Sequence, residues 1–107
     1  MIPARRLPAL LVPLALVAAA VPVTGQTQVD AKDNRFTPPA IQVPVGTAVT
    51  WRLRDGLVPH DVTGEGWSSG DPRRNGSFTH TFDKAGTYPY RCTVHDGMRG
   101  RVVVTGT

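Results

Sequence analysis

Residues 88–98 read Tyr-Pro-Tyr-Arg-Cys-Thr-Val-His-Asp-Gly-Met and form the most informative stretch of the chain. Its first half alternates large apolar side chains with other residues, which is typical of a half-buried β-strand. Its second half contains Asp96-Gly97, a pair typical of a tight turn. We therefore expect a strand that ends at Cys92, followed by a short loop that carries His95 and Met98 to the next strand.

The same two-residue alternation recurs on both sides of this stretch. It is seen in the runs 41–45, 49–53, 78–82 and 102–104. Turn-forming pairs such as Asn75-Gly76 separate the runs, and the high content of glycine (11) and proline (10) favours a turn-rich β protein. A length of 107 residues allows one domain of ordinary size. Many short strands joined by turns predict an all-β sandwich or barrel.

The N-terminal segment has the composition of a secretory signal peptide. Arg5 and Arg6 precede an apolar run over 7–23, and small residues at 18–20 and 23–25 offer cleavage sites. We predict a signal peptide over 1–25, cleaved near 20–25, and a mature domain over 26–107. The alternative is a retained membrane anchor, for which the run is slightly short and is interrupted by prolines. We expect no stable membrane insertion after cleavage.

Removal of the predicted signal peptide changes the charge of the protein. The 12 lysines and arginines fall to ten without Arg5 and Arg6, against the same eight acidic residues. A weakly charged secreted domain is not expected to bind nucleic acid. One cysteine cannot form an intramolecular disulfide, and three histidines are too few for a centre with several metal ions.

Cys92, His95 and Met98 form a Cys-x-x-His-x-x-Met pattern of potential metal ligands. A thiolate, an imidazole and a thioether are soft and borderline donors, the combination that suits copper. A tight loop can present all three to one ion, and His60, between two other predicted strands, offers a second imidazole. Each residue also has a structural interpretation, as a buried thiol, a core methionine or a surface histidine. A secreted protein rarely keeps a free thiol without a role, which favours the ligand interpretation.

His80 is the remaining histidine and serves as an internal comparison. It lies between two threonines on the strand face that also carries Phe78 and Phe82, with no ligand type beside it. We expect His80 to have a structural role and to lie outside any metal site.

The chain resembles the cupredoxins, the small type 1 blue-copper proteins, of the plastocyanin and amicyanin type and most of all the amicyanin type. The short Cys-x-x-His-x-x-Met loop followed by Arg-Gly-x-Val-Val-Val carries that last comparison. The resemblance implies a Greek-key β-sandwich of seven to eight strands. The matching residues are Phe36, Pro39, Ile41-x-Val43-x-Val45-Gly46, Val49-Thr50-Trp51, Pro59-His60-x-Val62, Phe78-x-x-Thr81-Phe82, Ala85-Gly86-Thr87-Tyr88-x-Tyr90-x-Cys92, His95, Met98 and Gly100.

The resemblance also implies a ligand set for one type 1 copper ion. His60, Cys92 and His95 correspond to the equatorial ligands, and Met98 to the weak axial ligand. The chain departs from the family at Asp61, where Asn is common and ties the two ligand loops together. Since a carboxylate can accept a hydrogen bond from a hydroxyl, we expect Asp61 to contact Thr93 in the same linking role.

These residues together predict a periplasmic or secreted electron carrier rather than an enzyme. We expect a monomer that binds transient redox partners near His95, where the surrounding residues Val58, Pro59, Val94 and Gly97 are apolar or small. The neighbouring arginines 73, 74, 99 and 101 are candidates for selecting an acidic partner. The alternative is a copper storage or chaperone protein without a redox role, although such proteins tend to carry methionine- or histidine-rich tracts.

Overall fold

The computed structural model describes residues 20–106, which form strands and turns. The predicted signal segment up to residue 19 lies outside the described residues. Within residues 20–106, no helix is long and apolar enough to cross a membrane. Among these residues there are ten strands, of which seven have three or more residues. They are β1 (Val23–Thr24), β2 (Gln28–Lys32), β3 (Arg35–Thr37), β4 (Ala40–Pro44), β5 (Ala48–Arg54), β6 (Thr63–Gly64), β7 (Trp67–Ser68), β8 (Asn75–Thr81), β9 (Gly86–Arg91) and β10 (Arg99–Thr105).

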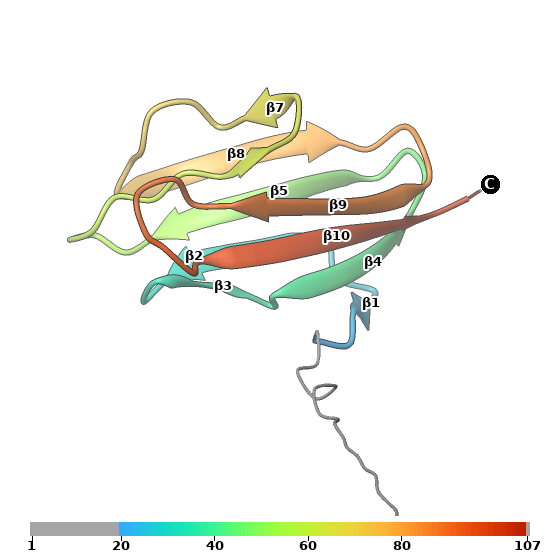
Figure 1. Cartoon of the computed structure of the whole chain (residues 1–107), viewed down its shortest axis with the longest axis horizontal. Coiled ribbons are helices and arrows are strands. Elements are labelled where there is room, and N and C mark those ends of the chain that lie inside the picture. The colour runs from blue at the N-terminus through green and yellow to red at the C-terminus, as the bar shows by residue number, and fades with distance from the viewer. Residues whose placement is uncertain (1–19, 107) are drawn as a thin grey trace, which may run out of the picture.

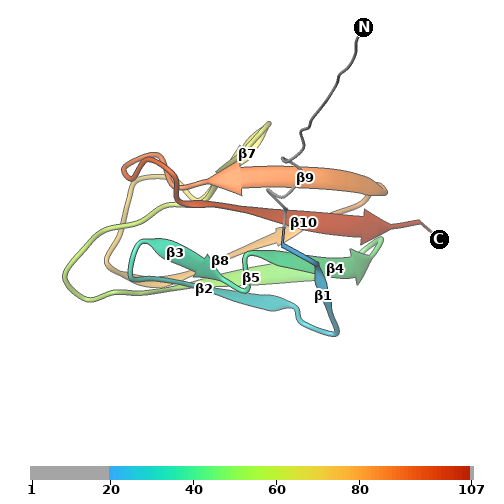
Figure 2. The same cartoon turned by 60° about the horizontal axis from the view of Figure 1, so that its bottom comes forward.

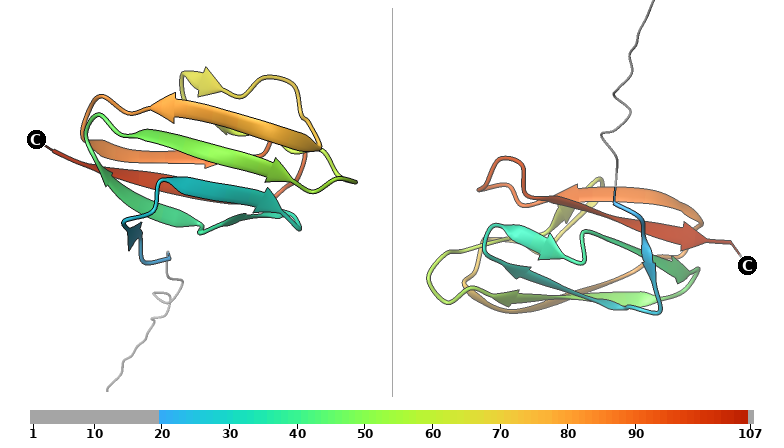
Figure 3. Two further views of the ribbon diagram at one scale, coloured as in Figure 1. Left: turned by 180° about the vertical axis from the view of Figure 1, so that it is seen from behind. Right: turned by 90° about the horizontal axis from the view of Figure 1, so that it is seen from below.

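The strands form two sheets that pack face to face as a β-sandwich, as predicted (Figure 2). One sheet has the strand order β1-β4-β10-β9-β6-β7, and the other has the order β3-β2-β5-β8. Chain neighbours such as β4 and β5 lie in different sheets, so the chain crosses repeatedly between the two layers. The view from behind in Figure 3 shows β8, β5 and β2 side by side in front of β9 and β10.

The hydrophobic core fills the space between the sheets and follows the alternation read from the sequence. In β5 the buried residues are Val49, Trp51 and Leu53, and the residues between them face outward. Trp51 is fully buried and packs edge-on against Tyr90, with 5.2 Å between ring centroids. Tyr90 in turn lies directly over Gly100 on β10, where a Cβ atom would approach the tyrosine ring to 2.4 Å. This contact explains the glycine, because any side chain there would collide with the core tyrosine.

His80 lies in an aromatic cluster on β8, well apart from the other two histidines in the fold. Its ring stacks on Trp67 with 4.7 Å between centroids and 11° between planes, and meets the edge of Phe82 at 4.8 Å. His80 does not belong to the candidate metal-ligand group found among the described residues. The expected structural role of His80 agrees with this packing.

β1 lies at the edge of the larger sheet, next to β4. Val23 and Thr24 pair in parallel with Ile41 and Gln42. The Arg101 guanidinium donates a hydrogen bond to the backbone carbonyl of Ala20, just before this strand. Part of the predicted cleavage region, 20–25, is therefore paired with the sandwich.

Three loops lie together at one end of the sandwich: 55–62 after β5, 69–74 before β8 and 92–98 between β9 and β10. Figure 1 shows that β9 runs toward this end and β10 runs away from it, and that β5 also ends there, opposite the C-terminus. Antiparallel pairing of β9 with β10 extends to Arg91 and Arg99, so the intervening loop 92–98 starts and finishes at the paired ends of these two strands. This arrangement fixes where the predicted ligand loop lies.

Candidate metal centre

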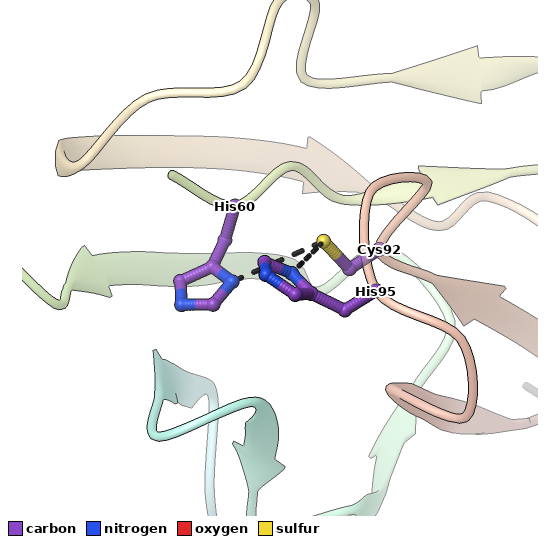
Figure 4. A group of neighbouring side chains, drawn as sticks. All are labelled: His60, Cys92 and His95. Atoms are coloured by element: carbon purple, nitrogen blue, oxygen red, sulfur yellow. Dashed lines mark hydrogen bonds between the residues drawn. The ribbon is translucent and has the colours of Figure 1, made fainter. Parts of the chain in front are cut away.

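His60, Cys92 and His95 converge at the end of the sandwich that carries the loops. The Cys92 Sγ atom lies 3.4 Å from His95 Nδ1 and 3.9 Å from His60 Nδ1. One donor atom from each residue lies within 4.8 Å of the others, and Figure 4 shows both imidazoles directed toward the sulfur. Residues 32 positions apart in sequence, His60 and Cys92, are thus brought together by the fold.

The backbone of the loop holds Cys92, His95 and Met98 in a compact turn. The Cys92 N–H donates to the Met98 carbonyl at 3.0 Å, and the Met98 N–H donates to the His95 carbonyl at 3.2 Å. Met98 is buried, with 2% of its surface exposed. Cys92, His95 and Met98 also line one small cavity of about 30 Å³. The loop therefore brings the predicted thioether to the same region as the thiol and imidazole.

His60 is fixed from both its backbone and its ring. Its N–H and C=O exchange hydrogen bonds with the C=O and N–H of Arg73, each at 2.9 Å. The ring is fully buried, and its Nε2 lies 2.8 Å from a carboxylate oxygen of Asp55. Because an ionised carboxylate only accepts hydrogen bonds, the proton belongs on Nε2, and the Nδ1 lone pair is left facing Cys92.

Asp55 is a residue beside the site that the sequence analysis did not identify. The hydrogen bond from His60 is the main cause that holds the pKa of the Asp55 carboxyl below its usual value, against the opposing effect of burial. The pair Asp55-Gly56 is an ordinary turn signal, and a separation of five residues from a histidine matches no ligand motif. Only the fold shows the contact.

The predicted contact between Asp61 and Thr93 is present. The Thr93 N–H donates to Asp61 Oδ1 at 2.7 Å, and the Thr93 hydroxyl donates to Asp61 Oδ2. Asp61 is itself buried. The carboxylate therefore ties the loop of His60 to the loop of Cys92, in the role expected for it.

The donor set and its surroundings fit copper. A thiolate and two imidazoles are the donors found in type 1 copper sites, and a nearby methionine supplies a weak fourth donor. Of the three converging residues, His60 and Cys92 are buried and His95 is partly exposed. Apolar side chains lie exposed on the two loops that carry the ligands, notably Leu57 (85% exposed) and Val94 (47% exposed). A metal ion at this place would be shielded from solvent by the protein, except at the partly exposed imidazole of His95.

Comparison with known proteins gives a consistent result. Residues 23–105 match the sequence model of a family described as copper binding proteins, plastocyanin/azurin family. The chain is similar to amicyanin from Paracoccus denitrificans, with 38% identity over 94 residues that cover 81% of this chain and 71% of that protein. It is also similar to amicyanin-alpha from Methylorubrum extorquens, with 35% identity over 84% of this chain and 81% of that protein.

Solved structures agree with the sequence comparison. The structure of the reduced state of an amicyanin variant matches with a TM-score of 0.67 and 36% identity, over 76% of this chain and 83% of that one.

Proposed function

The chain belongs to the plastocyanin/azurin family of copper-binding proteins, and on this premise we propose that it carries single electrons between other proteins. Its cofactor is one type 1 copper ion, which supplies a one-electron Cu(II)/Cu(I) couple when bound. The observation that supports this proposal most directly is the convergence of a buried thiol and two imidazoles within 4.8 Å at one end of a rigid sandwich.

The proposed ligands are His60, Cys92, His95 and Met98. His60 Nδ1, the Cys92 thiolate and His95 Nδ1 would hold the ion, and the Met98 thioether would supply a weak fourth donor. Cysteine binds metal as the thiolate, so metal binding releases the thiol proton. Support for Met98 comes from its burial and from its place in the hydrogen-bonded loop, where its carbonyl accepts the Cys92 N–H.

The role of the protein scaffold is to keep these ligands still during electron transfer. The His60 backbone is paired with Arg73, and Asp61 joins the two ligand loops through Thr93. A site held this way changes little between the two oxidation states, which keeps the reorganisation needed for transfer small. Two of the three histidines of the chain are proposed ligands of this one ion, and the third, His80, is engaged with Trp67, so no histidine is left to hold a second, substrate-binding copper. We therefore propose a carrier and not an enzyme.

His95 provides the proposed route for electrons to the surface. It is the partly exposed member of the three converging residues, and exposed Leu57, Pro59 and Val94 lie on the same two loops. A small apolar surface of this kind suits transient redox partners, which bind weakly and leave quickly. Arg73 and Arg74 lie beside Leu57 and Pro59 around one shallow cavity, where they would favour an acidic partner.

The remaining parts of the proposal concern location and assembly. We propose that the chain is exported to the periplasm or secreted after cleavage of its N-terminal segment, and that it works as a monomer. The composition of the N-terminal segment, with two arginines before an apolar run, supports export.

The test is to add Cu(II) to the purified copper-free protein and record the visible spectrum, followed by reductive and oxidative titration. We expect an intense thiolate-to-copper band that disappears on reduction and returns on oxidation. Cys92→Ala and His95→Ala should lose the band, whereas His80→Phe, a matched histidine substitution away from the site, should keep it. A band that persists in Cys92→Ala contradicts the ligand set. A blue protein that cannot be reduced reversibly favours copper storage.

A further inference from the structure

The buried imidazole His60 has a carboxylate on the side of its ring that faces away from Cys92. Asp55 Oδ2 lies 2.8 Å from His60 Nε2, whereas the other ring nitrogen, Nδ1, lies 3.9 Å from the Cys92 sulfur. His60 is fully buried and the Asp55 side chain is only 13% exposed. A negative charge therefore stands one imidazole ring away from the proposed copper position, largely shielded from solvent.

Asp55 is held in place from three directions, which makes the contact a built feature of the fold. The same Oδ2 atom accepts the backbone N–H of Asp33 at 3.2 Å, from the turn between β2 and β3. The backbone N–H groups of Asp55 and Gly56 both donate to the Arg74 carbonyl, each at 3.2 Å. Lys32 adds a weaker favourable charge interaction. A carboxylate fixed in this way can hold the orientation of a ring that it contacts.

We propose that Asp55 is a positioning residue for the copper site, one that fixes the tautomer of His60 and lowers the reduction potential through its charge. This inference rests on the proposed function of the site. The hydrogen bond places the His60 proton on Nε2, so that Nδ1 is free to bind metal. The carboxylate also makes the imidazole a better electron donor and stabilises the more highly charged Cu(II) state over Cu(I).

Two substitutions separate the geometric effect from the charge effect. In Asp55→Asn the side-chain oxygen can still accept a hydrogen bond from the His60 Nε2–H, but the negative charge is gone. In Asp55→Ala both the acceptor and the charge are gone. Asp96→Asn is the matched control, because Asp96 is an exposed carboxylate in the ligand loop, and among the described residues its side chain has no hydrogen bond or ion pair.

The first measurement uses the copper-free protein and nitrogen NMR of the imidazoles. We expect wild-type His60 to carry its proton on Nε2, with slow exchange against water. Asp55→Asn should keep this state, and Asp55→Ala should show a mixture of tautomers with faster exchange. An Asp55→Ala spectrum identical to wild type would overturn the positioning role.

The second measurement is the reduction potential of the copper-loaded proteins. We expect Asp55→Asn to favour Cu(I) by about tenfold relative to wild type, which for a one-electron couple is a rise of about 59 mV. Asp96→Asn should shift the potential much less, because solvent screens its charge. Equal shifts in the two variants, or no shift in Asp55→Asn, would overturn the charge effect. A wild-type protein that binds no copper would instead overturn the proposed function itself.

Discussion

Asp61 illustrates how one buried carboxylate can join two loops that are distant in sequence. It accepts both the N–H and the hydroxyl of Thr93, 32 residues away, and its own side chain is nearly inaccessible to water. Hydrogen bonds to a charged group contribute more than neutral ones, and a buried donor that loses its acceptor keeps the cost of desolvation. Asp61 therefore connects the loop of the proposed ligand His60 to the loop of the proposed ligand Cys92.

We predict that Asp61→Ala lowers the free energy of unfolding by about 2–4 kcal/mol, because the two hydrogen bonds from Thr93 to a buried, charged acceptor are lost. Asp61→Asn should cost far less, since an amide can accept from the N–H and donate to the hydroxyl oxygen. Urea unfolding of the copper-free proteins measures both values. Equal losses in the two variants would show that the charge, and not the pair of hydrogen bonds, stabilises the connection.

Tyr90 carries a buried hydroxyl that has no hydrogen-bond partner among the described residues. The Trp51 indole N–H, also without a partner, is near enough to oppose the effect of burial on the Tyr90 pKa, but the pair does not reach hydrogen-bond geometry. Burial is the larger effect, and it raises the pKa of Tyr90 well above its usual value of 10.0. The hydroxyl therefore stays neutral in the folded protein when the unfolded chain ionises.

This difference predicts a loss of stability in alkali. Below about pH 10 the Tyr90 hydroxyl is protonated in both the folded and the unfolded protein, so it has no effect on how stability depends on pH. Above about pH 10 only the unfolded protein releases this proton, so the free energy of unfolding falls as the pH rises. The loss is up to about 1.4 kcal/mol per pH unit. Tyr90→Phe should change stability at pH 7 by less than about 1 kcal/mol and remove this alkaline slope. Denaturant midpoints of the wild type and of Tyr90→Phe, measured between pH 8 and about pH 11, test this prediction. If the alkaline loss of stability is the same in both proteins, another group is responsible.

At the level of residues, much of the site could be predicted from the sequence. The one residue that was missed, Asp55, was missed for a physical reason. His60, Cys92 and His95 were identified from donor chemistry and from a resemblance, and the structure brings their donor atoms together. Asp55 was missed because its contact depends on how the segment between β5 and β6 folds back against the β2–β3 turn. No local spacing encodes a contact of that kind.

At the level of elements, strands with clear alternation were easier to predict than short or edge strands. β4, β5, β9 and β10 match predicted runs because their inward residues are large and apolar. β6 and β7 contain two residues each, which is too short for a period of two to be recognised. β2 buries only Val29 and the small Ala31, so its alternation is weak in the sequence.

The pairing of β1 with β4 leads to a prediction about processing. Cleavage after Gly25 would remove Val23 and Thr24 from the sheet, whereas cleavage after Ala20 would leave them paired. Ala18 and Ala20 also supply the small residues that signal cleavage needs. Of the two cleavage sites that the sequence offers, the strand pairing favours the earlier one, so we now predict that the exported protein begins at Val21 and not at Gln26, which intact mass measurement would show. A chain that begins at Gln26 should have a free energy of unfolding lower by about 1–2 kcal/mol, since it lacks the hydrogen bonds of β1. An exported chain that starts at Gln26 would contradict the prediction.

For the molecule as a whole, a small sandwich with a buried metal site makes stability depend on copper. A domain of roughly 80 residues buries a limited core and is only marginally stable by itself. Copper binds the folded protein, where His60, Cys92 and His95 converge, far better than the unfolded chain, where they are dispersed. Binding to one state alone shifts the folding equilibrium toward that state.

We predict that copper at a thousandfold its dissociation constant raises the free energy of unfolding by about 4 kcal/mol. Urea denaturation followed by circular dichroism, with and without copper, measures the increase. Cys92→Ser should lose most of the effect, because an alcohol replaces the thiolate while the side-chain volume changes little. His80→Phe should retain it, since His80 packs against Trp67 away from the site. An equal copper effect in Cys92→Ser would mean that the stabilising ion binds elsewhere on the molecule.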